Sequence, residues 1–475
     1  MRLDSLLQWC RQERPVAATA SGWIAFQLGL LLLASSLLLA VPPLFWALLQ
    51  GTRRLRRPWG SDRLNWVFLL IAGLMLLGAP RAHSGWLAWV GLMNWLPFFW
   101  GFWGFQPYMA TPGARRRMAL LIVAGGVPVL VTGLGQHFLG WSGPWQALGG
   151  LVIWHMAPGG LPPGRLSGLF DYANIAAAWL AFSWPLLLAA AFECCSRFRG
   201  GQARWRLPVV AILVIAQLAA LYLTDSRNGW GAAVLALPLV LGPARWLWLL
   251  PLLLLALAPV LLAVLPGVPE LLQHPARALV PEAIWGRLSD LAFSDRPLAS
   301  TRLGQWTVAA GLVAERPWLG WGAAAFSLVY PKRAGVWHGH PHNLPMDLAI
   351  SHGLPVALLL VGVVLWLLLR SARLGMAGGP VFERAWWAAV LILVLLHATD
   401  LPFYDGRLNV AGWLLLAGLR AACWPQAFRP SEPPGGDWRG RPRVGGPPGG
   451  PRGAADLWPS GRGSPPPRRA GGRRR

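Results

Sequence analysis

Long apolar segments alternate with short, arginine-rich segments along most of the chain. A helix needs roughly 20 apolar residues to cross a hydrocarbon core about 30 Å thick, and many segments approach this length. The apolar runs are continuous rather than alternating, and lipid offers no water to satisfy backbone polar groups, so helices are the expected spanning form. The expected fold class is therefore all-α, a polytopic membrane protein with about twelve transmembrane helices.

The apolar pattern also predicts where the helices lie. Residues 22–50 are interrupted by Ser35 and Ser36 and are interpreted as a hairpin of two short helices, with one long tilted helix as the alternative. Further spans are expected at 64–79, 85–105, 118–135, 172–192, 207–224, 228–243 and 246–266, and after a long polar stretch at 353–370, 385–399 and 408–422.

Four parts of the chain follow from this pattern. Residues 1–266 are expected to hold about nine spans, and residues 267–352 a large outer loop that carries the catalytic motif. Residues 353–422 supply the last three spans. Residues 423–475 are rich in Pro, Gly and Arg and cannot bury a core, so a disordered tail is expected.

Arginines in the short loops set the orientation. They gather near 53–63, 115–117, 197–206 and 370–384, which fall on one side together with both termini if the first run is a hairpin. Because short cytoplasmic loops carry excess arginine, that side is predicted to be cytoplasmic. The loops 136–171, 225–228, 267–352 and 400–407 then lie outside, where the chemistry is expected.

Composition agrees with a membrane protein, since 55% of residues are hydrophobic and only 13% are charged. The net charge of +24 is spread between apolar runs rather than along one face, which argues against nucleic acid as a partner. Four cysteines show neither zinc spacing nor a disulfide framework. Most of the 31 tryptophans are attributed to interfacial belts; those in 141–165 indicate a re-entrant or amphipathic element.

Candidate chemistry lies in three outer stretches, because the spans are nearly free of ionisable residues, which argues against a proton-coupled carrier. The first is 164–174, which opens a span and contains Arg165. The second is 225–230, where Arg227 adjoins a helix N-terminus and would suit a phosphate group. A snorkelling arginine paired with Asp225 is the structural alternative.

The third stretch is His338-Gly339-His340-Pro341-His342-Asn343. Asn343 is a good helix cap and Gly353 a good stop, so a short helix is predicted over 344–352. His342 would precede its N-terminus, whose dipole favours the neutral ring that a general base requires. The three histidines could instead bind a metal, although no Cys, Asp or Glu ligand lies beside them, or serve a structural role.

At these residues the chain resembles the O-antigen ligase and polymerase superfamily of bacterial inner-membrane proteins. Similar stretches are 226–230 (SRNGW), Arg302 with Trp306 and 315–322 (ERPWLGWG), and His342-Asn343 followed nine residues later by Gly353. The resemblance extends from about Gly22 to Ala422 and departs from the superfamily pattern at Val356 and at 172–174 (YAN).

This resemblance implies transfer of a glycan from undecaprenyl diphosphate to an acceptor sugar hydroxyl, such as that of the lipid A-core, at the periplasmic face. It implies inversion, no metal and no cofactor. His342 would be the base and Arg227 would stabilise the leaving diphosphate. His340 would orient His342 or contact the acceptor. The expected substrate-binding residues are Arg302, Arg165, His340, Arg316 and Asn343.

Other functions remain open at this point. A polysaccharide polymerase would use the same donor but extend another lipid-linked chain, and a protein O-oligosaccharyltransferase would use a protein acceptor. A bicarbonate or other small-anion transporter is the alternative from a different class, although such a carrier should show a polar site at mid-membrane. In every case the lipid bilayer is an expected partner.

Overall fold

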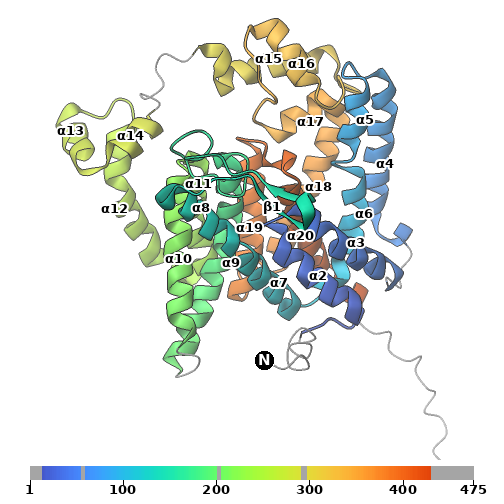
Figure 1. Cartoon of the computed structure of the whole chain (residues 1–475), viewed down its shortest axis with the longest axis horizontal. Coiled ribbons are helices and arrows are strands. Elements are labelled where there is room, and N and C mark those ends of the chain that lie inside the picture. Colours follow the sequence, from blue (N-terminus) through green and yellow to red (C-terminus); the bar gives the residue numbers. More distant parts are fainter. Residues whose placement is uncertain (1–12, 55–58, 201–204, 290–296, 429–475) are drawn as a thin grey trace, which may run out of the picture. The chain divides into compact units, whose positions relative to one another are not determined.

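The computed structural model describes residues 13–54, 59–200, 205–289 and 297–428, and nearly all of its regular structure is helical (Figure 1). Six helices are long and apolar enough to cross a membrane. They span Arg63–Arg81, Pro112–Leu139, Ala173–Arg199, Arg206–Leu223, Pro243–Val264 and Leu354–Arg373. For the described residues, the prediction of an all-α, multi-pass membrane protein is confirmed.

The N-terminal apolar run forms the predicted pair of helices. Helix α2 spans Ala20–Leu33 and α3 spans Leu37–Arg54, and the two pack against each other. Ser36 separates them, and its side chain accepts a hydrogen bond from the backbone N–H of Leu39 at 3.4 Å. The alternative of one long tilted helix is therefore wrong.

Two predicted spans are interrupted. After α4 (Arg63–Gly78), the segment 85–105 divides into α5 (Trp86–Leu92) and α6 (Leu96–Gly104), with a proline in the first turn of α6. The segment 118–135 begins earlier than predicted and divides into α7 (Pro112–Gly125) and α8 (Val127–Leu139). Proline in the first turn of each later helix supplies no N–H, which marks the break.

Helix α9 (Ala173–Arg199) lies at the centre of the helices. It packs against α10 (Arg206–Leu223), α11 (Arg227–Leu241) and α19 (Val381–His397). Of its most apolar stretch of 18 residues, 83% is buried inside the protein. Helix α12 (Trp246–Val264) packs with α13 (Glu270–Leu279) and α14 (Glu282–Leu288). Only 11% of its corresponding stretch of 18 residues is buried. An apolar helix so exposed is suited to contact lipid.

The last part of the chain positions the candidate site. Helices α15 (Arg302–Glu315), α16 (Ala325–Ala334) and α17 (Leu344–His352) lie together at the top of Figure 1. Helix α17 leads directly into α18 (Leu354–Arg373), and α20 (Gly406–Cys423) packs beside α18 and α19. The short helix predicted over 344–352 is confirmed at both ends.

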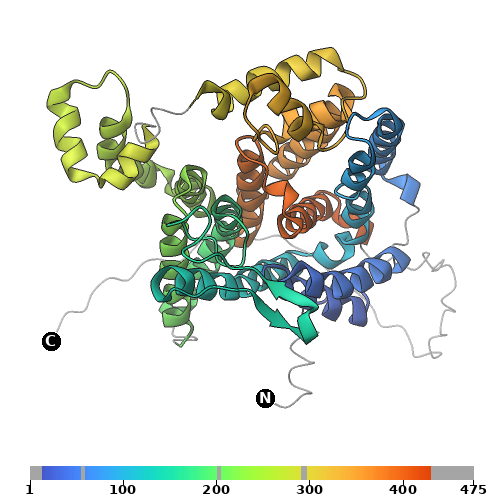
Figure 2. The same cartoon turned by 45° about the horizontal axis from the view of Figure 1, so that its top comes forward.

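Residues 141–165 contain an element that differs from the prediction. Strand β1 (Trp145–Ala147) pairs antiparallel with β2 (Val152–Trp154), where a re-entrant or amphipathic element was expected. The indole N–H of Trp154 donates to the carbonyl of Ser35 at 2.7 Å, which fixes the hairpin beside α2 and α3 (Figure 2). The strands are too short to give a clear sequence pattern.

Several arginines are buried in pairs near helix ends. The guanidinium of Arg115 donates two hydrogen bonds to Glu383, at 2.9 and 2.6 Å, and Arg420 contacts Asp62 at 2.8 Å. Buried charges persist when they are paired in this way. The described cysteines, Cys194, Cys195 and Cys423, are all free. Cys10 and residues 429–475 of the predicted tail lie outside the described residues, whereas Cys423 ends α20 and Pro425–Phe428 form a short helix.

Candidate active site

Asn343 joins two parts of the candidate site. Its side-chain oxygen accepts from the backbone N–H of Met346 at 2.9 Å, which caps α17, and its amide N–H donates to the carbonyl of Ala398 at 2.9 Å. This second bond links the entry of α17 to the segment that follows α19. The amide group thus holds the backbone in place, and a role for Asn343 in substrate binding stays a prediction.

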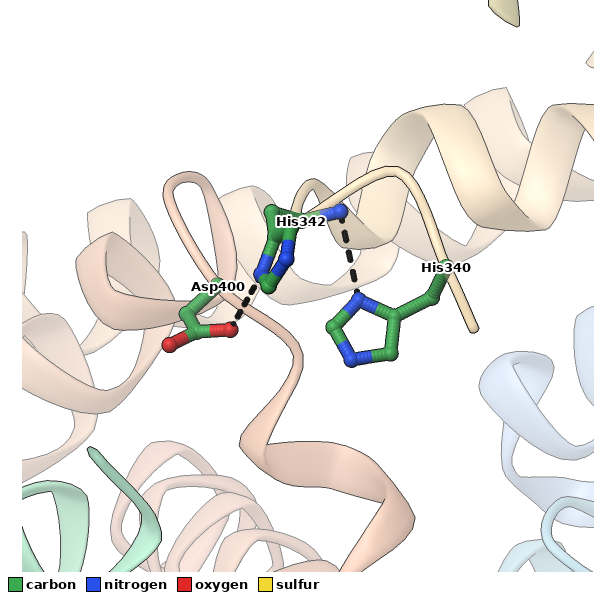
Figure 3. Close-up of side chains that lie close together, drawn as sticks. All are labelled: His340, His342 and Asp400. Atoms are coloured by element: carbon green, nitrogen blue, oxygen red, sulfur yellow. Dashed lines mark hydrogen bonds and ion pairs between the residues drawn. The ribbon is translucent and has the colours of Figure 1, made fainter. Parts of the chain in front are cut away.

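His342 stands just before the cap in an unusual backbone conformation. Its φ is +51°, in the left-handed region that residues with a side chain rarely adopt. The ring directs Nδ1 at the carboxylate of Asp400, and the distance from Nδ1 to Oδ1 is 2.8 Å (Figure 3). A carboxylate bonded to one ring nitrogen fixes the tautomer and leaves Nε2 to act as a base.

Asp400 remains ionised in this setting. Burial raises the pKa of its carboxyl group, but the hydrogen bond with His342 and the positive charge of that ring when it is protonated oppose the effect of burial, together with the N–H of Leu401 at 2.9 Å. The net result is a pKa lowered to about 2. Asp400 is therefore a permanent anion beside the imidazole at neutral pH.

A chain of hydrogen bonds extends from Asp400 to the first outer stretch. The amide of Asn174 donates to Asp400 Oδ2 at 3.1 Å and its oxygen accepts from Arg165 Nη2 at 2.5 Å. Arg165 Nε donates to the carbonyl of Thr224 at 2.7 Å. The first outer stretch is therefore linked through Asp400 to His342 of the third stretch, and it contacts the residue just before the second stretch. Arg165 forms the cationic end of this chain.

His340 lies on the other side of His342. The two ring centroids are 4.4 Å apart, and His340 Nδ1 accepts from the backbone N–H of His342 at 3.3 Å, as Figure 3 shows. Burial lowers the pKa of His340 to about 4, and protonation of the neighbouring His342 acts in the same direction. The bond holds the backbone of His342, and the role of His340 in orienting His342 or contacting the acceptor stays a prediction.

The same groups form a possible metal-ligand set. One ligand atom each from His340, His342 and Asp400 lies within 4.8 Å of the others. No Cys, Asp or Glu ligand lies beside the histidines in the sequence, but Asp400 supplies a carboxylate from a distant part of the chain. Two imidazoles and a carboxylate suit a divalent ion such as Zn²⁺. In the structure, however, Nδ1 of His342 is directed at Asp400 itself.

The two other predicted arginines each begin a helix. Arg227 is the first residue of α11, three positions after Thr224, so it lies on the segment that Arg165 contacts. Arg302 is the first residue of α15, and one turn later the indole N–H of Trp306 donates to the carbonyl of Pro341 at 2.9 Å. Both helix starts are thus attached to the segments around His342 and Arg165.

Arg316 lies in a different environment. Its guanidinium stacks over the Trp321 ring, 4.1 Å from the centroid. The surrounding segment is bonded to the end of α17, with Trp321 N–H donating to the Ile350 carbonyl at 2.6 Å. These contacts give the segment 315–322 a structural role, and a role for Arg316 in substrate binding stays a prediction.

Gly353 explains why a glycine follows α17. Its φ is +88°, and a Cβ atom here would lie 2.1 Å from the carbonyl oxygen of Trp318. Only glycine allows this approach. Two of the sequence stretches that carried the resemblance, 315–322 and the glycine after His342-Asn343, therefore pack against each other.

The comparisons with known proteins bear on the middle of the chain. Residues 211–361 match the sequence model of the family described as O-antigen ligase. The matched range contains Arg227, Arg302 and His342, whereas Arg165 and Asp400 lie outside it. No curated protein matches the chain.

Proposed function

We propose that the protein is a glycosyltransferase of the O-antigen ligase type, because residues 211–361 match the O-antigen ligase family. It would transfer a glycan from undecaprenyl diphosphate to a sugar hydroxyl of the lipid A-core, or of another glycan. The observation that carries this proposal is the contact of His342 Nδ1 with Asp400 Oδ1 at 2.8 Å, with Arg165 connected to the same carboxylate through Asn174.

The proposed reaction uses these groups in one displacement. Nε2 of His342 takes the proton of the acceptor hydroxyl as its oxygen forms a bond to the anomeric carbon. The bond from that carbon to the diphosphate oxygen breaks, and its electron pair leaves with the diphosphate. Attack from the opposite face inverts the anomeric centre. Asp400 stabilises the imidazolium that forms, as a carboxylate does for a catalytic histidine in general.

The arginines supply the opposite charge. Arg227, with Arg302 or Arg165, would bind the diphosphate and stabilise the negative charge that grows on it. Arg227 and Arg302 are also the first residues of helices, where free backbone N–H groups favour phosphate. In this mechanism a base and cationic residues perform the whole reaction, so it requires no metal.

The proposed membrane arrangement follows the apolar pattern. About twelve membrane segments, both termini in the cytoplasm and residues 267–352 in the periplasm place the candidate site outside the inner membrane. The helices shorter than a full span, such as α11 and α19, would be completed by neighbours. Fusions of a periplasm-dependent enzyme after residues 280 and 376 test this, because only the first should be active.

Deletion of the gene tests the function and separates ligase from polymerase. Loss of the ligase should leave rough lipopolysaccharide and accumulated lipid-linked glycan. Loss of a polymerase should leave a single repeat on the core, because both enzymes use the same donor but different acceptors. Unchanged surface glycans in the deletion strain would contradict both forms of the proposal.

A further inference from the structure

The catalytic pair has chemically different neighbours on its two sides. On one side, Asn174 connects Asp400 to the guanidinium of Arg165. On the other side lie the rings of His340 and Tyr404, whose centroids are 5.9 Å apart and whose planes differ by 29°. One side is cationic, and the other is aromatic.

Tyr404 is held in place by its hydroxyl group but remains partly exposed. It ends the short helix η8 (Pro402–Tyr404), and its hydroxyl donates to Asp347 Oδ2 at 2.8 Å. Asp347 is buried in α17, with 6% of its surface exposed, whereas Tyr404 is 45% exposed. The preceding residue, Phe403, is buried and stacks on Trp95 at a centroid distance of 4.1 Å. The turn is therefore anchored while part of the surface of Tyr404 stays exposed.

We propose that Tyr404 and His340 form the subsite for the acceptor sugar, next to His342, and that Tyr404 is its main binding surface. An aromatic face gives a rigid, apolar contact to the C–H groups of a sugar ring at little entropic cost. The inference rests on the proposed function, because it names which substrate approaches from which side of the catalytic pair.

Charge supports the same polarity. The phenol of Tyr404 is uncharged at neutral pH, because a tyrosine ionises only at about pH 10. The carboxyl group of Asp347 behind Tyr404 carries no positive charge that could attract a diphosphate. An uncharged sugar suits this side, and the anionic donor suits the side of Arg165.

Separate kinetic constants for the two substrates test the subsite. The full-length protein would be assayed in lipid nanodiscs with rough lipopolysaccharide as the acceptor probe and lipid-linked glycan, extracted from the deletion strain, as the donor. Tyr404→Ala should raise the KM for rough lipopolysaccharide about tenfold and leave the KM for the donor unchanged. Tyr404→Phe keeps the ring and should stay within about threefold of the wild-type acceptor KM.

Two controls keep the result decisive. Trp86→Ala removes another exposed aromatic ring, at the start of α5, and should change neither KM. Tyr404→Leu keeps apolar volume without an aromatic face, and it replaces the alanine variant if that variant does not fold. An unchanged acceptor KM in Tyr404→Ala or Tyr404→Leu, or a rise in the donor KM instead, would overturn the subsite. A wild-type protein that transfers no glycan would contradict the proposed function itself.

Discussion

Replacement of Asp400 by asparagine should slow glycan transfer strongly while the protein stays folded. Asp400 accepts from His342 on Oδ1 and from Asn174 on Oδ2. Asparagine has one oxygen and one NH₂ group, so the N–H of either His342 or Asn174 would face this NH₂ group instead of an oxygen. A flip of Asn174 would only transfer the conflict, because its oxygen already accepts from Arg165 at 2.5 Å.

The magnitude follows from the charge that is lost. A hydrogen bond to a charged group contributes about 1.5–3 kcal/mol, and a carboxylate about 4 Å from an imidazolium contributes about 4 kcal/mol at an effective dielectric constant near 20. These two estimates describe the same interaction, so the barrier should rise by about 2–4 kcal/mol. The rate at saturating substrates should therefore fall roughly 30- to 1000-fold.

The assay is the rate of transfer from lipid-linked donor to rough lipopolysaccharide by protein in nanodiscs. Asp405→Asn is the matched control: Asp405 caps α20 and pairs with Arg407 at 2.6 Å in the same loop. Asparagine is an equally good cap, so this variant should keep a rate within about threefold of wild type. If Asp400→Asn transferred glycan as fast as Asp405→Asn, the role given to the carboxylate would be refuted.

Three further predictions concern stability, measured by thermal or denaturant unfolding in detergent. Asn343→Ala removes the cap of α17 and should cost about 1–2 kcal/mol, whereas Asn343→Asp should keep most of the cap. Gly353→Ala places a Cβ against Trp318 at a φ of +88° and should cost about 2–5 kcal/mol of stability. The control Gly362→Ala adds a Cβ in open space within α18 and should be neutral or slightly stabilising. Equal changes in stability for the two variants would contradict the packing at Gly353. The pKa of His340 is lowered from 6.5 to about 4 in the folded protein, so the neutral ring contributes stability that is lost as the pH falls below 6.5. The free energy of unfolding should therefore drop by about 2 kcal/mol from pH 7 to pH 5. In His340→Gln, the free energy of unfolding should depend less on pH.

Local chemistry explains what the sequence could predict. The helix after His342 was predictable because an asparagine cap and a glycine stop act within a few residues of their own positions. The hairpin at 145–154 escaped prediction because strands of three residues show no alternation. The breaks near 93–95 and at Gly126 were missed because long apolar segments flank both, with only Asn94 as a polar residue between them at the first break.

The contact between His342 and Asp400 could be predicted only in part. His342 stood out beside its helix cap, but its partner Asp400 lies 58 positions later, and only the packing of α17 near the end of α19 brings them together. The available signal was topological, since both residues fall in loops predicted on the same side. Tyr404 and Asp347 fall in the same two loops, but no local feature of the sequence marks them as partners, because their contact depends on the same packing.

The most direct test of the account is transfer by purified protein carrying His342→Ala, with wild type measured in parallel. We expect the wild type to move the glycan from the lipid-linked donor to the acceptor, and the variant to be at least about 100-fold slower while it unfolds at a similar temperature. A folded His342→Ala variant that transfers glycan at the wild-type rate would contradict the central claim.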